Sequence, residues 1–331
     1  MGELLKNPDV SIVVVSFNTK DLLRECLQSI RDESEGLAVQ TIVVDNDSKD
    51  GSPQLVKDEF PEVELIETGA NLGFAGANNV GFKQCRGRYV VLLNSDAFLQ
   101  PGSLHLSVRK MDEDTTIGLG GARLVSRDGS WQPSARMFPS VLNDFLTLSG
   151  LSAKFSHSKF FGRVDRTWAS PDEEADVDWV PGAFSIVPRG LLEKIHYFDE
   201  DFFLYYEEVD LCRRIKKLGY RVCYWPDVVV VHIGGESTRS TGKKVSKSGS
   251  QVALWRMRSE LLYYRKHHGA LGAFCAKQLD QKWHAMRALR NSMKGDEDSQ
   301  WRADEFRELA QLMEQAWDDT KGGKISPPRP W

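Results

Sequence analysis

The sequence has few of the features expected of a disulfide-bonded, membrane-spanning or nucleic-acid-binding protein. Its 331 residues include five cysteines and no Cys-x-x-Cys pair, so we expect reduced core thiols in a reducing compartment. The longest apolar runs, residues 10–15 and 228–231, have the length of strands and are far too short to cross a bilayer. A net charge of −4 gives no overall attraction to nucleic acid.

The start of the chain is also unlike a targeting segment. Residues 1–9 are polar and include acids, which is not typical of a secretory signal. We therefore expect a soluble cytoplasmic protein, with peripheral contact at the inner face of the membrane left open. With 41% apolar residues, a chain of this length can form one large α/β domain or two small ones.

The first half of the chain alternates between short apolar runs and helical patterns. The runs at residues 11–17, 41–45, 63–68 and 88–94 are rich in β-branched residues, which suits central strands covered on both faces. The helical patterns cover residues 20–31, 52–60, 75–85 and 101–111. This alternation predicts an α/β fold with a mostly parallel, doubly wound sheet.

Polar residues follow each of these predicted strands. They are residues 16–18, which include Ser16 and Asn18, then 45–50, 71–79 and 94–96. Ligands of such sheets bind at the carboxyl ends of the strands. We therefore expect all four clusters to meet at one edge of the sheet and to form a binding site.

The second half is less regular. Periodicity fades between residues 126 and 178, where aromatic residues are scattered among Ser, Gly and Pro. A long irregular segment of this kind inside a compact domain is usually functional or mobile. Order returns at residues 177–188, and residues 202–220 read as a loop that enters a helix ending at Gly219. Residues 221–225 and 228–233 are two further predicted strands.

The C-terminal region divides by charge. Residues 234–250 have the composition of a linker, so we expect a catalytic domain at 1–250 and a helical extension at 251–331. Residues 251–295 contain nine Lys or Arg and two Asp or Glu, whereas residues 296–321 are acidic. The two segments are expected either to pair as an antiparallel helical hairpin or to leave the basic helix free to dock on anionic lipid.

Asp96 and His232 are candidate metal ligands. Asp96 lies just past a predicted strand, where a carboxylate is well placed to hold a hard cation, and His232 ends the apolar run VVVVHI. For each residue taken alone, a structural role is the favoured alternative: a turn or cap for Asp96 and a satisfied core histidine for His232.

Glu207, Glu208 and Asp210 form the densest group of carboxylates and open a predicted helix beside aromatic residues. Desolvation there would raise a carboxylate pKa toward useful basicity. The alternative is that acids in a first turn complement the helix dipole, with Asp210 paired to Arg214 at i,i+4.

Two further segments have open interpretations. Asp45 closes a buried strand and either contacts a ligand or caps the next helix. Arg239 and nearby lysines either fold over a diphosphate or belong to a solvated linker.

In their order along the chain, these segments resemble the inverting family 2 glycosyltransferases of the GT-A fold, in particular the bacterial rhamnosyltransferase-like branch. The motifs are VVVSFN, VVDNDSKDGS, NLGFAGANN, NSDA, FFLYYEEVDLCRRIKKLGY and VVVVHIGGES. NSDA resembles the family's Asp-x-Asp metal motif, and the Glu-Glu pair stands where the family has Glu-Asp. The resemblance extends over about residues 10–240 and does not reach residues 251–331.

The resemblance implies a role for each motif. Asp45 would contact the pyrimidine base, Asp96 and His232 would bind a divalent cation (Mn²⁺ or Mg²⁺), and Glu208 would be the base, with Glu207 and Asp210 as alternatives. The sugar and acceptor would lie near Trp179, Pro181 and Gly182. The other residues expected at the nucleotide sugar are Ser16, Asn18, Asn71, Gly73, Asn78, Asn94, Ser95 and Arg239.

The implied reaction moves a sugar, rhamnose or another hexose, from a UDP- or dTDP-sugar to a hydroxyl of a saccharide or lipid-linked saccharide in bacterial surface polysaccharide or glycolipid assembly. One alternative is a sugar nucleotidyltransferase, but its Gly-rich loop is missing from SFNTKD after the first strand. Another is a non-catalytic binding module on a dead transferase fold, against which the intact Asp96, Glu208 and His232 argue.

Overall fold

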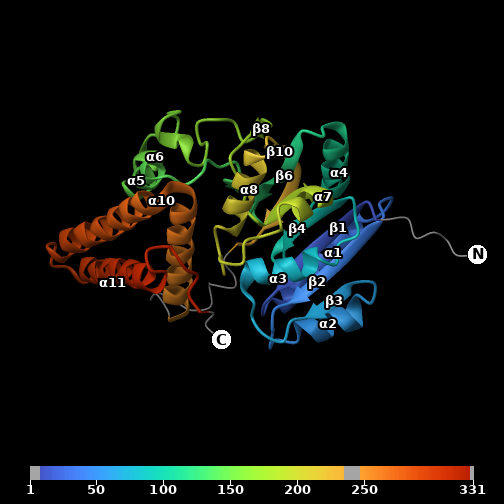
Figure 1. The fold of residues 1–331 in the computed structure, drawn as a ribbon, viewed down its shortest axis with the longest axis horizontal. Coiled ribbons are helices and arrows are strands. Elements are labelled where there is room, and N and C mark those ends of the chain that lie inside the picture. The colour runs from blue at the N-terminus through green and yellow to red at the C-terminus, as the bar shows by residue number, and fades with distance from the viewer. Residues whose placement is uncertain (1–7, 235–246, 329–331) are drawn as a thin grey trace, which may run out of the picture.

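A mixed ten-stranded sheet forms the centre of the molecule in the computed structural model, which describes residues 8–234 and 247–328 (Figure 1). The main strand order is β3-β2-β1-β4-β9-β6-β10-β5. In its first half, β1 (Val10–Ser16), β2 (Val39–Asp45), β3 (Glu64–Glu67) and β4 (Tyr89–Asn94) are parallel neighbours. These are the four strands that the apolar runs predict.

The second half of the sheet contains antiparallel strands. β9 (Phe184–Pro188) runs antiparallel to both β4 and β6 (Ile117–Val125), and β5 (Ala97–Leu99) runs antiparallel to β10 (Arg221–His232). β6 and β10 are parallel. The short strands β7 (Trp131–Gln132) and β8 (Ala175–Asp176) pair with β6 and β10. The sheet is therefore mostly but not wholly parallel.

One prediction about the strands needs correction. Residues 221–225 and 228–233 are predicted as two strands, but the structure has one strand, β10, with an irregular register between Trp225 and Val229. Pro226, which has no N–H for the ladder, lies at this irregularity. Within residues 177–188, where order returns, the strand β9 begins at Phe184.

Helices cover both faces of the sheet, as the doubly wound pattern predicts. α1 (Lys20–Glu33), α2 (Ser52–Glu59) and α4 (Ser103–Glu113) contribute apolar residues to the core on one face. α3 (Gly73–Phe82), α7 (Arg189–Lys194) and α8 (Glu207–Lys217) contribute to the core on the other. α8 ends before Gly219, which has a φ of 87°, a conformation that glycine adopts readily.

The segment from residue 126 to 178 contains helices that its sequence did not predict. These are α5 (Val141–Leu148), α6 (Leu151–Lys154) and the 3₁₀ helix η1 (Phe161–Arg163). In α5 the buried residues are Asn143 and Leu146, which is too few to give a clear helical stripe. Ser140 caps this helix by accepting a hydrogen bond from the N–H of Asn143.

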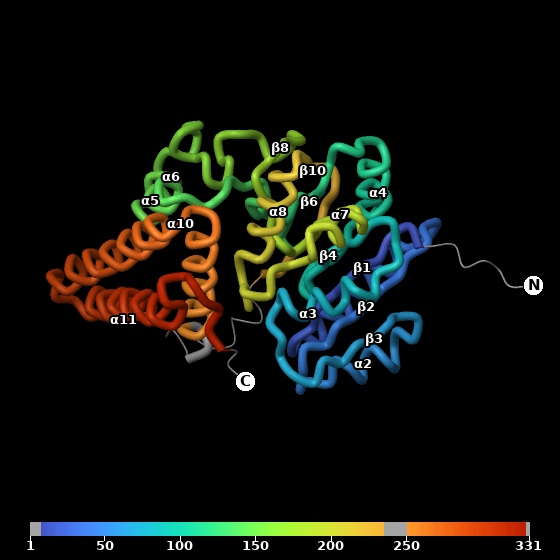
Figure 2. The backbone as a smooth tube through the Cα atoms, viewed as in Figure 1, coloured from blue at the N-terminus to red at the C-terminus, as the bar shows by residue number. Residues whose placement is uncertain are grey.

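The C-terminal helices form an arm beside the sheet. α10 (Lys247–Ser292) bends at Gly269, where φ is 74° and ψ is −173°, into a proximal limb (residues 247–268) and a distal limb (270–292). α11 (Glu297–Asp319) runs back along the distal limb (Figures 1 and 2). The predicted pairing of basic and acidic helices is therefore formed, but between the distal limb and α11.

Two further properties bear on the expectations from composition. All five cysteines lie within the described residues and are free, four of them buried. Across residues 8–234 and 247–328, none of the helices combines the length and apolar character that a membrane span requires.

Candidate active site

The polar clusters that follow β1, β2 and β4 meet at one edge of the sheet. Register explains this, because Ser16 at the end of β1 pairs with Asp45 of β2, and the neighbouring Val15 pairs with Asn94 of β4. Past the strand ends, the hydroxyl of Thr19 donates to Ser95 Oγ at 2.9 Å. Asn18, held at a φ of 55°, donates its N–H to Ser48 Oγ, also at 2.9 Å. The predicted convergence is confirmed for these three clusters.

Two buried oxygens at this edge have no donor. Asp45 Oδ1 accepts from the N–H of Ser48 at 2.9 Å, but its Oδ2 has no hydrogen-bond partner among the described residues. Asn94 Oδ1 is likewise buried without one. An unsatisfied buried acceptor costs about 1–3 kcal/mol, so each oxygen is available to a ligand. Asp45 does not cap α2, because Asp50 accepts from the N–H of Ser52 instead.

The amides of residues 71–79 are largely used inside the fold. Asn71 Oδ1 accepts from Asn46 Nδ2 at 2.9 Å, which ties the segment after β3 to the segment after β2. Asn78 is buried within α3 and donates to the carbonyl of Phe74 at 2.9 Å. These contacts give both residues a structural task at the edge of the site.

The backbone of Gly73 lies very close to the backbone of Phe203, a residue of the same chain. An added Cβ would lie 2.3 Å from the carbonyl oxygen of Phe203, and the φ of Gly73 is 76°. The next residue, Phe74, donates its N–H to the same carbonyl at 2.8 Å. The start of α3 is therefore fixed against the loop that precedes α8.

Asp96 and His232 lie together, although they are far apart in sequence. β5 and β10 pair so that His232 is opposite Ala97, and His232 Nε2 is 3.5 Å from Asp96 Oδ1. Both side chains are largely buried, with 17% and 13% of their surface exposed. The N–H of Gly234 donates to Asp96 Oδ2 at 3.2 Å.

Gln132 orients the imidazole, a role that the sequence did not reveal. Its Nε2 donates to the carbonyl of His232 at 2.7 Å, which leaves its Oε1 3.0 Å from His232 Nδ1. This arrangement favours the tautomer with the proton on Nδ1 and the lone pair of Nε2 facing Asp96. Burial lowers the pKa of His232, and it outweighs the negative charge of Asp96, which acts to raise that pKa. The neutral imidazole, the form that binds metals, is therefore favoured.

The side chains at this point are compared with the donors that a cation requires. In the described ranges, no group of three or more His, Cys, Asp or Glu side chains is arranged to hold a metal. The Asp96 carboxylate and the His232 imidazole supply one oxygen and one nitrogen donor, and the unpartnered Oδ1 of Asn94 lies at the end of β4, two residues before Asp96. This donor set fits a divalent cation that takes its remaining ligands from a bound anion.

Glu207 and Glu208 open α8 and share an unusual environment. In each, Oε2 is buried without a hydrogen-bond partner among the described residues. Burial raises the pKa of Glu207 well above its ordinary value, and the neighbouring Glu208 raises it further. Burial also raises the pKa of Glu208, and the hydrogen bonds at the start of the helix and the charge of Arg136 partly oppose the shift. Both carboxyls are therefore more basic than exposed glutamates.

Asp210 has a different environment. It is fully buried and lies 2.7 Å from each of three cationic or polar groups, Arg214 Nε, Lys266 Nζ and His267 Nε2. Burial alone would raise its pKa, but these partners outweigh it and lower the pKa below its usual range. The i,i+4 pairing with Arg214 is formed. Asp210 thus joins α8 to the proximal limb of α10 and is poorly suited to act as a base.

The loop before α8 is strained and supported from the arm. Tyr205 and Tyr206 both have a φ of 69°, a conformation that costs non-glycine residues free energy and often marks functional sites. The ring of Phe203 packs on Trp255 of the proximal limb, with centroids 4.4 Å apart. Ser259 Oγ donates to the carbonyl of Leu204 at 2.8 Å. The arm therefore fixes the position of the two glutamates.

The loop that contains Trp179, Pro181 and Gly182 runs between the surroundings of Glu208 and the end of β4. Trp179 Nε1 donates to the carbonyl of Met137 at 2.8 Å, and the Arg136 guanidinium lies 5.2 Å from the centre of the Trp179 ring. At the other end of the loop, Ala183 accepts from the N–H of Asn94 at 3.1 Å. Since Arg136 also acts on the pKa of Glu208, this loop connects the glutamates to the pair Asp96 and His232. Arg239 lies outside the described residues.

Known proteins resemble this chain in both sequence and fold. The model of the family described as glycosyl transferase family 2 matches residues 11–168. N-acetylglucosaminyl-diphospho-decaprenol L-rhamnosyltransferase of Mycobacterium tuberculosis is 30% identical over 243 residues, which cover 69% of this chain and 76% of that protein. The chain belongs to glycosyl transferase family 2.

A further relative resembles this chain in sequence, and two solved structures resemble it in fold. Rhamnosyltransferase WbbL of Escherichia coli is 24% identical to this transferase over 266 residues, covering 77% of the chain and 92% of WbbL. The mannosyltransferase PcManGT of Pyrobaculum calidifontis, solved with GDP-Man and Mn²⁺, has a TM-score of 0.55 at 18% identity and covers 96% of this chain and 88% of its own. GalNAc-T7, solved with UDP, GalNAc and Mn²⁺, also has a TM-score of 0.55, at 13% identity, and covers 97% and 59%. The predicted family, enzyme class and α/β fold are confirmed.

Proposed function

We propose that this transferase moves a hexosyl residue, rhamnose as the first choice, from a UDP- or dTDP-sugar to a hydroxyl of a lipid-linked saccharide in bacterial surface polysaccharide or glycolipid assembly. Two relatives are named for rhamnosyl transfer, and the name of one includes a diphospho-decaprenol acceptor. We further propose that the reaction inverts the anomeric centre in a single displacement.

The donor would bind along the ends of β1, β2 and β4. The free Oδ2 of Asp45 is an acceptor suited to an N–H of a pyrimidine base, and it is buried where β2 ends. Ser16, Asn18 and Ser95 lie in the adjoining hydrogen-bonded network. A divalent cation, Mn²⁺ or Mg²⁺, held by Asp96 and His232 would neutralise charge on the departing diphosphate. Arg239 is proposed to contact the same diphosphate.

Glu208 is proposed as the general base. It would take the proton of the acceptor hydroxyl as the acceptor oxygen bonds to the anomeric carbon, while the bond from that carbon to the diphosphate oxygen breaks. The observation that carries this proposal is the buried, unpartnered Oε2 of Glu208 at the start of α8, together with its raised pKa. Glu207, buried more deeply, is expected to hold its proton beside it.

Ligand-dependent stability tests the donor side. We expect one of UDP-rhamnose, UDP-glucose, dTDP-rhamnose and dTDP-glucose to raise the melting temperature in the presence of Mn²⁺ or Mg²⁺, since a ligand at 100 times its Kd adds about 2.7 kcal/mol to the unfolding free energy. Asp96→Ala should keep its ligand-free melting temperature and lose the metal-dependent increase. An Asp96→Ala enzyme with the wild-type increase and wild-type turnover would reject the proposed metal site.

Transfer tests the acceptor side. The purified enzyme is incubated with the donor that binds and with a polyprenyl-diphosphate-linked GlcNAc, and the product is identified by mass spectrometry and by the anomeric coupling constant. A product that retains the anomeric configuration of the donor would contradict the single displacement. Transfer to a free sugar but not to the lipid-linked one would contradict the proposed acceptor class.

A further inference from the structure

The distal limb of α10 exposes an apolar face. Leu271 and Leu289 in this limb have 74% and 64% of their surface exposed, and Met286 is about half exposed. Met293, directly after the limb, is 79% exposed. We call these four apolar residues, together with Lys282 and Arg290, the outer face. Single exposed apolar residues are common on protein surfaces, whereas a contiguous apolar patch is typical of an interaction site.

Helical spacing places these residues on one side. Steps of three and four residues connect positions 271, 275, 278, 282, 286 and 289, and such steps follow a single stripe of a helix. The opposite side of the distal limb is already in contact with other helices. His284 stacks on Phe306 of α11, and Trp283 packs edge-on against Phe145 of α5. The outer face is therefore the side that α5 and α11 leave uncovered.

The charge on the distal limb itself is mostly positive. Residues 270–294 contain five Lys or Arg and a single acid, Asp280. The Asp280 side chain is only 13% exposed and lies 3.5 Å from His284 on the covered side. Lys282, Arg290 and Lys294 are exposed. Apolar residues flanked by cations, without acids, are typical of helices that lie in the headgroup region of anionic bilayers.

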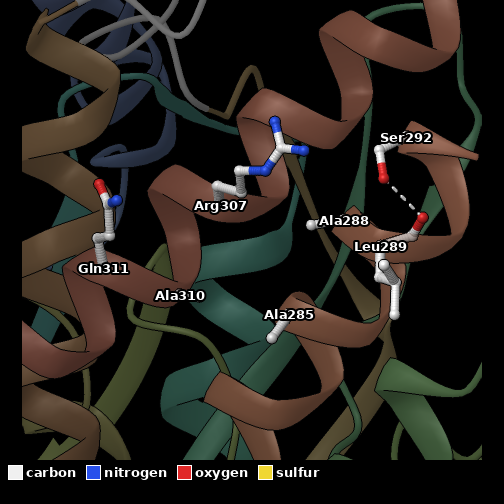
Figure 3. A pocket seen from close by; sticks show the side chains of 7 residues that line it. All are labelled: Ala285, Ala288, Leu289, Ser292, Arg307, Ala310 and Gln311. Atoms are coloured by element: carbon white, nitrogen blue, oxygen red, sulfur yellow. Dashed lines mark hydrogen bonds between the residues drawn. The ribbon is translucent and has the colours of Figure 1, made fainter.

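A hollow adjoins the outer face. Figure 3 shows the cavity between the distal limb and α11, with a volume of about 280 Å³. Three alanines, Ala285, Ala288 and Ala310, leave this space open beside Leu289, and Arg307 extends along its edge. The apolar lining and the neighbouring guanidinium match the chemistry of an acyl chain that lies beneath a phosphate headgroup.

A second copy of the chain fits this face less well. Lys282 lies near the middle of the stripe, so an antiparallel pair of distal limbs related by a two-fold axis would place Lys282 close to its own copy. Like charges brought together in this way oppose association. An anionic surface has no such penalty and gains from every exposed cation on the face.

We propose that the outer face lies flat in the interface of an anionic bilayer and holds the catalytic domain next to a lipid-borne acceptor. The proximal limb links this face to the loop that positions Glu207 and Glu208, through the contact of Trp255 with Phe203. The proposal deepens the proposed function and rests on it for the nature of the acceptor. The binding to lipid is a separate property, which is measured without donor or acceptor.

Flotation of the full-length protein with vesicles tests the proposal. The vesicles are phosphatidylcholine alone or phosphatidylcholine mixed with phosphatidylglycerol. We expect binding to the mixed vesicles that weakens with added salt and falls at least about tenfold in the Leu289→Glu, Met293→Glu double variant. Lys282→Gln with Arg290→Gln should remove the preference for phosphatidylglycerol. Leu218→Glu directly after α8, where the leucine is 46% exposed, is the matched control and should bind like the wild type.

The outcomes distinguish membrane docking from dimerisation and from failure of the proposed function. Equal vesicle binding by the wild type and the double variant would overturn the proposal, and so would light scattering that shows a wild-type dimer and a monomeric double variant. Since all substituted residues are exposed, unchanged melting temperatures will show that the variants are folded. The double variant should still transfer sugar to a detergent-dispersed acceptor. If vesicle binding holds but no donor and acceptor pair gives transfer, the proposed function fails while the docking face stands.

Discussion

Replacing Glu208 by glutamine separates catalysis from stability. The substitution preserves the shape of the side chain and removes its ability to accept a proton. A positioned general base contributes about 10²- to 10⁴-fold to the rate, which corresponds to about 3–5 kcal/mol in the activation barrier. We therefore expect kcat to fall by that factor, with donor affinity close to that of the wild type because Glu208 is not among the proposed donor ligands.

The same substitution should not destabilise the protein. Burial raises the pKa of Glu208 in the folded state, so the folded chain binds this proton more tightly than the unfolded chain does. The free energy of unfolding of the wild type must then fall as the pH rises above the ordinary glutamate pKa, and it stops falling above the raised pKa. Glutamine does not titrate, so its side chain causes no such loss of stability. At alkaline pH the Glu208→Gln enzyme should be at least as stable as the wild type.

The measurements are kcat at saturating donor and acceptor between pH 5 and pH 9 and the melting temperature over the same range. The wild type should lose activity as the pH falls through the raised pKa of its base. Glu207→Gln is the matched control, since it removes a second buried carboxyl from the same turn while most of the turnover should remain. Wild-type turnover in Glu208→Gln would refute the assignment of the base. A melting temperature that falls together with activity at every pH would refute the stability argument.

Three further predictions concern the surroundings of the site. Gln132→Leu removes the acceptor for His232 Nδ1 and should weaken Mn²⁺ binding about 10- to 100-fold, as titration with the metal will show. Asp210→Asn removes the buried carboxylate that pairs with the partly exposed Arg214 and Lys266 and should cost about 1.5–3 kcal/mol in denaturant unfolding. Because the pKa of Asp210 is lowered, this loss should be present at neutral pH and disappear as the pH falls below the ordinary aspartate range. Gly73→Ala would force a Cβ onto the Phe203 carbonyl and should reduce kcat together with the melting temperature. Gly102 has a similar φ and open space around it, so the control variant Gly102→Ala should lower the melting temperature and leave kcat unchanged.

The sequence predicted the catalytic half of the fold well because its signals are local. Each of the first four strands is a run of apolar, β-branched residues, and each is followed by a polar segment. Once the strands are parallel and in register, Ser16, Asp45 and Asn94 must end side by side. The convergence of these residues therefore follows from the pattern along the chain.

Other parts of the site had no local signal. Gln132 lies in a two-residue strand inside an irregular segment, and its role depends on His232, which is a hundred residues away. Asp210 shows the same limit, because its spacing to Arg214 was visible in the sequence and its contacts with Lys266 and His267 were not. The bend at Gly269 was missed since a single glycine is tolerated within a helix.

The sequence by itself determined the α/β class, the edge of the sheet where the polar segments meet and the residue types gathered there, since each depends on the pattern of a short segment. Only the tertiary structure decided that Asp210 is neutralised, that Gln132 orients His232 and that the distal limb leaves an apolar face uncovered. These properties depend on which distant residues become neighbours. Burial and ion pairing are set by those neighbours, and the pattern along the chain does not specify them.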